Sequence, residues 1–166
     1  VDGAVVTRID PAEVPDLVRR LRAGQPVRTR VDEGIVQTGP VIFAPMERGA
    51  AIRAAVNMTP EEVIARLNGS KLRGRGGAGF PTAMKWDFCR KAKGEAHYVV
   101  CNADEGEPGT FKDRVVFTRA SDLVFEGMTV AGWAIGAQEG ILYLRAEYDY
   151  LREPLEAVLD RRRRLG

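Results

Sequence analysis

The amino-acid sequence predicts an α/β fold in which helices flank a layered sheet of parallel strands. Helical and strand-like patterns alternate from residue 59 to the end of the chain, which is typical of such sheets. The 166 residues are enough for one domain with its own core. Apolar residues make up 45% and charged residues 29%, the balance of a soluble globular protein.

A small strand-helix unit is expected to precede this sheet. Residues 5–6 form its short strand. Its helix begins at Pro11, because Asp10 is a good N-cap and Glu13 follows the cap by three residues. Gly24 is expected to end this helix.

The next segment is expected to be an extended connection. Residues 25–49 are interrupted repeatedly by proline and glycine, which disfavour a long helix or a central strand. We predict one or two short strands within it, around Ile35 and Val41.

Two helices are predicted on either side of a glycine-rich loop. Thr59 and Glu62 form a capping box that opens the first helix, which ends at residues 68–69. The second helix is predicted over residues 81–93, with a proline at its start.

Two strands and two further helices complete the pattern. The strands are predicted over residues 96–102 and 139–145, and the helices over 122–137 and 149–164. The intervening segment 103–114 is predicted to be a loop. Strands that alternate with helices in this way indicate a parallel sheet.

The composition argues against several kinds of site. Cys89 and Cys101 lack the spacing of a metal or cluster motif, so we expect no bound metal and expect Cys101 to pack as a small apolar side chain. His97, the only histidine, is expected on the surface. No apolar run reaches the roughly 18 residues that a membrane helix needs, and no secretory signal pattern opens the chain. We therefore expect a cytoplasmic protein without direct membrane insertion.

The glycine-rich loop lies in the sequence LRGRGGAGFPTAMKW, residues 72–86. Its glycines satisfy the pattern G-x-G-x-x-G, but a helix rather than a strand precedes them, so the ordinary dinucleotide fingerprint is excluded. Missing side chains let a flat ligand approach the main chain, and the helix that starts at Pro81 directs free N–H groups toward the loop. With Arg75 and Lys85 nearby, an anionic planar ligand fits; a plain turn with solvated arginines is the alternative.

An acidic loop follows the first predicted strand. Asp104, Glu105 and Glu107 lie where open α/β sheets place their ligands. Such carboxylates repel a phosphate but accept hydrogen bonds from sugar hydroxyls or a ring N–H. Hydrolysis by paired carboxylates and ordinary solvated turn residues are the competing interpretations.

The two segments LRGRGGAGFPTAMKW and NADEGEPGTFKDR together closely resemble the flavin- and NADH-binding subunit of respiratory complex I. The same resemblance extends to the diaphorase subunit of NAD-reducing hydrogenases and the beta subunit of NAD-linked formate dehydrogenases. It covers residues 38–166 and implies the N-terminal part of a Rossmann-like FMN domain. Its cofactors would be FMN and NAD(H), and a 4Fe-4S cluster would belong to the parent subunit, with its ligands absent from this chain.

The resemblance also implies two groups of binding residues. Those expected to contact FMN are Gly74, Arg75, Gly76, Gly77, Lys85, Asn102, Asp104 and Glu105. Those expected on the NADH side are Phe80, Phe88 and Glu107. No catalytic acid or base is implied, because hydride passes between nicotinamide and flavin while the protein supplies stacking, distance and charge.

The resemblance suggests a division into two parts. Residues 1–37 look like the end of a thioredoxin-like domain plus a connector, which hydrogenase and formate dehydrogenase relatives often carry ahead of the flavin domain. Residues 38–166 would be the start of the FMN/NADH-binding domain. Ala83 stands where the family usually has glycine. The sequence stops before the family's second flavin loop and its four cluster cysteines, so we expect a fragment.

The expected function is therefore part of an NADH:acceptor oxidoreductase flavoprotein subunit that passes electrons to iron–sulfur clusters. Its partners would be other subunits of a hydrogenase, formate dehydrogenase or complex I. The alternative is a non-catalytic docking or structural fragment that binds no flavin by itself. The basic run 161–164 fits a helix C-terminus, where the helix dipole favours cations, and we expect no nucleic-acid partner.

Overall fold

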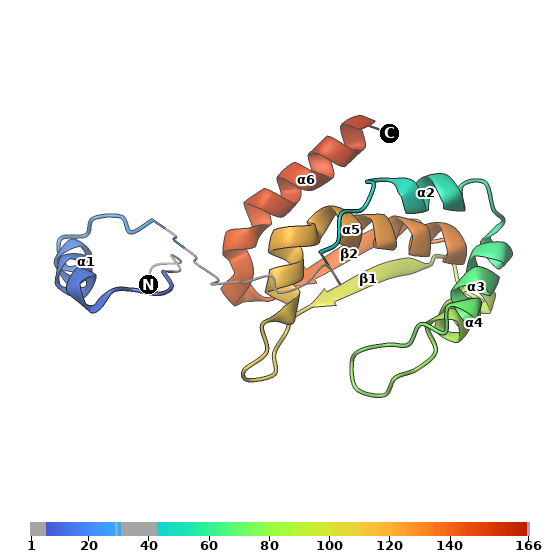
Figure 1. Ribbon diagram of the computed structural model, residues 1–166, viewed down its shortest axis with the longest axis horizontal. Helices are drawn as coiled ribbons and strands as arrows, with labels where there is room; N and C mark the ends of the chain where they lie inside the picture. The colour runs from blue at the N-terminus through green and yellow to red at the C-terminus, as the bar shows by residue number, and fades with distance from the viewer. Residues whose placement is uncertain (1–5, 29, 31–42, 166) are drawn as a thin grey trace.

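The computed structural model describes residues 6–28, 30 and 43–165 of the chain (Figure 1). It has the mixed α/β architecture that the sequence predicts. Its elements, in chain order, are the 3₁₀ turn η1 (Pro11–Glu13), α1 (Val14–Arg22), α2 (Ala50–Ala55), α3 (Pro60–Gly69), α4 (Thr82–Lys91), β1 (Tyr98–Ala103), α5 (Lys112–Ile135), β2 (Glu139–Leu144), the 3₁₀ turn η2 (Ala146–Leu151) and α6 (Arg152–Leu165).

The centre of the fold is the unit formed by β1, α5 and β2. The two strands are parallel and pair in register from Tyr98 with Glu139 to Ala103 with Leu144. The helices α5 and α6 lie on one side of them (Figure 1). Between these elements lies the main core, whose buried residues are Ala103, Phe117, Phe125, Tyr148, Leu151 and Leu155.

The opposite face of the two strands is uncovered in the described part of the chain. Side chains alternate along a strand, and directly paired residues share a face. Tyr98 and Val100 of β1 therefore lie on the same face as Ile141 and Tyr143 of β2, and all four are exposed. A second layer is missing from this side among the described residues.

A second core joins α2, α3 and α4 to the C-terminal half of α5. Its buried residues are Ala55, Val63, Ile64, Ala83 and Ala134. Ala83 lies in the first turn of α4 with 5% of its surface exposed, so its methyl group is packed inside this second core.

The helix α2 is one element that the sequence analysis did not predict. Its six residues follow Gly49, which has a φ of +76°. The carboxylate of Glu126, only 3% exposed, accepts hydrogen bonds from the N–H groups of Gly49 at 2.8 Å and Ala51 at 2.7 Å. This carboxylate from α5 thus caps α2 and fixes it to the core.

The helix α5 begins ten residues earlier than predicted. The segment 103–114 was expected to be a loop throughout, but the helix starts at Lys112 and continues to Ile135. It is kinked at Ala120, where φ is −141°. The carboxylate of Glu105 accepts hydrogen bonds from the N–H groups of Asp113 and Arg114 and so stabilises this early start.

The N-terminal unit has the predicted cap. The Asp10 carboxylate accepts a hydrogen bond from the Ala12 N–H at 2.8 Å, and the Glu13 carboxylate accepts one from the Asp10 N–H. The helix ends at Arg22, just before Gly24 with its φ of +65°. Val6 forms an isolated parallel bridge with Arg30. The rest of the predicted first strand and the strands expected around Ile35 and Val41 fall outside the described residues.

The capping box predicted at Thr59 and Glu62 is likewise present at the start of α3. The caps at Asp10 and Thr59 each depend on residues no more than three positions apart, which explains why they could be predicted from the sequence. Of the helices that the structure describes, none has the length and apolar character needed to cross a lipid bilayer.

Candidate functional site

The glycine-rich loop, residues 72–80, connects α3 to α4 and is closed at its neck by hydrogen bonds. Those bonds run from the Thr82 N–H to the Leu72 carbonyl at 3.0 Å, from the Gly74 N–H to the Phe80 carbonyl at 2.8 Å, and from the Arg73 guanidinium to the Gly79 carbonyl at 3.0 Å. The loop therefore has a fixed base, while its tip projects away from the body (Figure 1).

The glycines of this loop serve two different purposes. Gly77 and Gly79 have φ values of +108° and +61°, a region in which residues with a side chain are strained. Gly76 lies outside that region, and no atom lies within 4 Å of the position that its Cβ would take. Space beside the Gly76 main chain is thus open, as close approach of a flat ligand requires.

A groove of about 420 Å³ lies between this loop, α4, β1 and α5. From the loop it is lined by Gly74, Gly76, Ala78, Gly79 and Phe80. From α4 it is lined by Thr82, Lys85, Trp86 and Cys89, which are spaced as one face of a helix. Tyr98 and Val100 of β1 complete the side next to the open sheet face.

The groove has a positive side. Lys85 lines it, and Arg75 is exposed in the glycine-rich loop. Neither cation forms an ion pair with a carboxylate of residues 6–28, 30 or 43–165. Both charges are therefore available to an anionic ligand, whereas Arg73 is used to close the loop.

Two aromatic side chains flank the loop end. The rings of Phe80 and Phe88 lie 6.4 Å apart, inclined at 54°, and both side chains are exposed. Phe80 lines the groove; Phe88 does not. Two exposed rings of this kind offer faces on which a planar group can stack.

The acidic loop emerges on the same side of β1 as the glycine-rich loop (Figure 1). Asn102 belongs to the exposed face of β1, in line with Tyr98 and Val100, and its side-chain oxygen accepts the Asp104 N–H at 3.0 Å. The side chains of Asp104 and Glu107 are exposed in the loop that follows. None of these residues lines the groove itself.

Glu105 differs from its acidic neighbours because it is buried, with 8% of its surface exposed. Its carboxylate accepts hydrogen bonds from the Asp113 N–H at 2.8 Å, the Arg114 N–H at 3.3 Å and the Tyr148 hydroxyl at 2.8 Å. The guanidinium of Arg145 donates to its carbonyl at 2.6 Å. With a φ of +40°, Glu105 occupies a strained backbone position that these contacts maintain.

These contacts alter two pKa values. Burial alone would raise the pKa of Glu105, but the hydrogen bonds from Asp113, Tyr148 and Arg114 outweigh it and hold the pKa below its ordinary value. Burial, together with the hydrogen bond to Glu105, raises the pKa of Tyr148 to about 12. Glu105 is therefore a carboxylate acceptor at neutral pH, and Tyr148 is a neutral donor.

We expect the chain to lose stability in acid partly through Glu105. Because its pKa is lower in the folded chain, its contribution is present above the ordinary value of 4.5 and is lost as the pH falls through the folded-state pKa. Urea unfolding from neutral pH down to about pH 3 measures this loss. In Glu105→Gln the decline should be shallower than in the wild type; an identical decline in both proteins would contradict the assignment.

The competing hydrolase interpretation gains no geometric support. The Glu105 carboxylate is used by α5 and Tyr148, so it does not join Asp104 and Glu107 in one catalytic group. Among the residues that the structure describes, no group of histidine, cysteine or acidic side chains is arranged to hold a metal ion.

Two smaller predictions can be compared directly with the structure. Cys101 packs against the main core, as expected of a small apolar side chain, and burial raises the pKa of its thiol. His97 was expected on the surface but is half-buried, and its Nε2 atom is buried without a hydrogen-bond partner in the described structure.

Residues 67–166 match the Nuo51 FMN-binding domain family. The chain belongs to this family. The match spans the glycine-rich loop, the groove and the acidic loop, and it confirms the resemblance inferred from the two sequence motifs.

Several members of the family are similar to this chain. The NAD-reducing hydrogenase HoxS subunit alpha of Cupriavidus necator is 42% identical over 184 aligned residues, which cover 100% of this chain and 31% of that protein. An NADH-quinone oxidoreductase subunit of Rhizobium meliloti is 52% identical over 99 residues, covering 59% of this chain and 24% of that protein. The chain thus spans less than a third of the length of either relative.

A solved structure agrees with the fold. The crystal structure of an NAD⁺-reducing [NiFe]-hydrogenase in the air-oxidized state matches with a TM-score of 0.85 and 40% identity. The match covers 96% of this chain and 30% of the hydrogenase chain. This agreement supports the Rossmann-like flavin-domain fold that the sequence predicts.

The groove also contains residues that the sequence analysis did not select. Trp86 and Cys89 share the helical face of Lys85, so the spacing 82, 85, 86 and 89 could have indicated them. Tyr98 and Val100 were assigned to a strand, but which of its faces would be left open depends on where α5 packs.

Proposed function

We propose that this chain carries part of the FMN and NADH site of the flavoprotein subunit of an NAD(H)-linked multisubunit oxidoreductase. The observation that carries the proposal is the groove beside Gly76, where open main chain, a lysine side chain and the start of a helix come together within the family match. This combination suits a planar ligand with an anionic end.

The described residues fit FMN. Gly74, Gly76 and Gly77 would admit the flat ring to the main chain, and Arg75 and Lys85 would balance the phosphate charge. The chemistry that bound FMN would supply at this site is hydride acceptance from NADH and onward transfer of single electrons. No acid or base of this chain is required for that transfer.

The acidic loop would serve FMN in two ways. Asn102 and Asp104 would offer oxygen atoms to the hydroxyls or ring N–H of the cofactor. Glu105 would contribute chiefly by holding the loop in place, because its carboxylate is already used by Asp113, Arg114 and Tyr148.

The NADH side would be formed by exposed residues of both loops and of α4. Phe80 and Phe88 would provide stacking faces for the nicotinamide or adenine rings. Glu107 is exposed and would accept hydrogen bonds from the ribose hydroxyls.

The parent complex would be of the hydrogenase type. The hydrogenase subunit aligns along the whole chain, whereas the NADH-quinone oxidoreductase subunit aligns over 59% of it. In this proposal residues 1–37 remain a thioredoxin-like remnant with a connector, ahead of the start of the flavin domain. The partners would be other subunits of a cytoplasmic complex, and a 4Fe-4S cluster of the parent subunit would accept the electrons.

A comparison of FMN with riboflavin tests the proposal. FMN should raise the melting temperature of the purified chain, and the visible absorbance of FMN should change when the chain is added. Riboflavin lacks the phosphate, so both effects should be weaker with riboflavin. Lys85→Gln should reduce the advantage of FMN over riboflavin, since it removes a cation from the groove. Equal absence of any effect for both ligands would refute flavin binding by this chain.

A docking or structural role is the second candidate function. The exposed side chains of Tyr98, Val100, Ile141 and Tyr143 favour it, because an apolar sheet face of this kind is normally covered. In that case the chain would remain colourless with added FMN, and its melting temperature would not change.

A further inference from the structure

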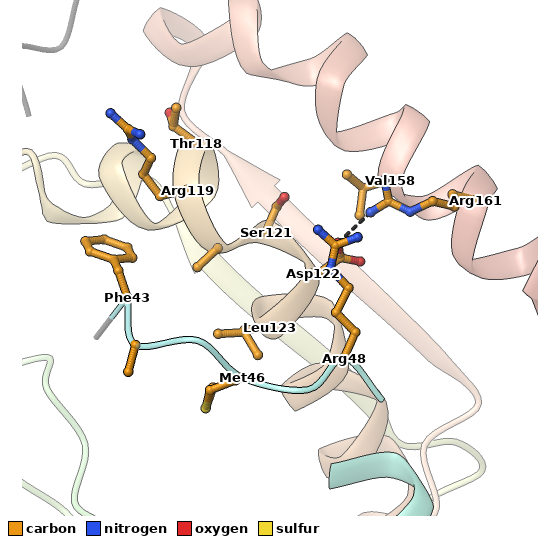
Figure 2. Close-up of a pocket in the computed structure, with 12 residues that line it drawn as sticks. Phe43, Met46, Arg48, Thr118, Arg119, Ser121, Asp122, Leu123, Val158 and Arg161 are labelled. Atoms are coloured by element: carbon orange, nitrogen blue, oxygen red, sulfur yellow. Dashed lines mark hydrogen bonds and ion pairs between the residues drawn. The ribbon is translucent and has the colours of Figure 1, made fainter. Parts of the chain in front are cut away.

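A second cavity, of about 560 Å³, lies beside the N-terminal half of α5. It shares no described residue with the groove beside the glycine-rich loop. It is formed where α5 kinks at Ala120, between the segment 43–48 and α6 (Figure 2). Its volume is in the range typical of small-molecule sites. Neither the family match nor the proposed flavin chemistry accounts for it.

The charges at this cavity are unbalanced. Asp122 in α5, with a side chain only 15% exposed, faces three guanidinium groups: Arg161 at 2.5 Å, Arg48 at 3.5 Å and Arg162 at 3.7 Å. One carboxylate can neutralise only one of them. Two positive charges therefore remain beside a partly enclosed space.

The three arginines are not equivalent. Arg161 makes the shortest contact with the Asp122 carboxylate, whereas Arg162, whose side chain is only 20% exposed, lies 3.7 Å from that carboxylate and donates to the Asp122 carbonyl at 3.4 Å. Arg48 and Arg161 line the cavity, and their side chains are 73% and 42% exposed. These two guanidiniums retain more donor groups than one carboxylate can accept.

The remaining lining defines the shape of a ligand. Figure 2 shows the Ser121 side chain between Arg119 at one end of the cavity and the Asp122 cluster at the other. Phe43, Met46 and Leu123 form an apolar wall from two elements. A ligand with an anionic group at Arg48 and Arg161 and a less polar part against this wall would use both features.

We propose that this cavity binds a small phosphorylated anion, with its phosphoryl group held by Arg48 and Arg161. The forked guanidinium matches phosphate oxygens in pairs, and a phosphoryl group carries the charge needed to balance two arginines. Asp122 acts as a positioning residue, because it holds arginines from the segment 43–48 and from α6 on one side of α5.

The test is a calorimetric titration of the chain with glycerol 3-phosphate and, separately, with inorganic phosphate. Arg48→Gln and Arg161→Gln should each weaken binding by about tenfold, the loss expected for one charge-assisted contact. Arg163→Gln is the matched control, because Arg163 lies on the same helix but pairs with Asp160. This control should bind as the wild type does.

Two results would overturn the proposal: unchanged binding in both cavity variants, or an equal loss in Arg163→Gln. Lys85→Gln separates this site from the groove beside the glycine-rich loop, since it should leave the binding of glycerol 3-phosphate unaltered. A loss in that variant would move the anion to the groove and equally refute the cavity site. Tighter binding of glycerol 3-phosphate than of inorganic phosphate would assign the site to a phosphate ester, and equal binding would assign it to free phosphate.

Discussion

Replacing Gly76 with valine should weaken FMN binding by at least about tenfold without destabilising the chain. The added side chain would occupy the open space in which the flavin ring is proposed to approach the backbone. That same openness means that no protein atom obstructs the valine, so the free energy of unfolding should change by less than about 0.5 kcal/mol. Fluorescence titration with FMN and urea unfolding measure the two effects.

Gly127→Val is a suitable control for this substitution. Gly127 lies in α5, also has no atom within 4 Å of its Cβ position, and does not line the groove. The control should bind FMN as the wild type does. If Gly76→Val bound FMN with unchanged affinity, the glycine-rich loop could not be the flavin cradle.

Replacing Glu105 with alanine should lower the free energy of unfolding by about 3 kcal/mol, the largest stability loss that we expect from one substitution in the acidic loop. The change leaves the N–H groups of Asp113 and Arg114 and the hydroxyl of Tyr148 without their acceptor. Each stranded donor costs about 1 to 3 kcal/mol when it stays buried, and water entry reduces the total. Urea unfolding at neutral pH measures the loss.

Glu107→Ala is the matched control for the acidic loop. Glu107 is two residues away and exposed, so its removal should change the free energy of unfolding by less than about 0.5 kcal/mol. Similar losses for both variants would show that Glu105 has no special role in holding the loop.

The parts of the fold that were predicted correctly have local causes. The capping boxes at Asp10 and Thr59 place donor and acceptor within three residues of each other. The apolar runs of β1 and β2 are short and continuous, and one face of each strand packs against α5. Such signals can be read without knowledge of the tertiary structure.

The parts that were missed depend on contacts between distant residues. The helix α2 is capped by Glu126, 77 residues beyond Gly49, and six alanine-rich residues give little periodic signal of their own. The early start of α5 depends on Glu105, eight residues before Asp113. In both cases the N–H groups at the start of the helix are capped by a buried carboxylate from elsewhere in the chain, and no side chain next to the helix start indicates that cap.

The same distinction applies to the candidate site. Gly74, Gly76, Phe80 and Lys85 lie close in sequence and line one groove, as a contiguous motif would suggest. Asp104, Glu105 and Glu107 look alike in the sequence, but the folded chain buries Glu105 and leaves Asp104 and Glu107 exposed. Their separate roles follow from the position of Tyr148, 43 residues further along the chain.

Amide NMR spectra of the ¹⁵N-labelled chain during titration with FMN test the central claim most directly. If the groove between the glycine-rich loop and α4 holds the cofactor, the largest shifts should occur at residues 74–79 and in the first turn of α4, with smaller ones at 102–104. Shifts concentrated elsewhere, such as around Asp122, with the glycine-rich loop unchanged, would contradict it.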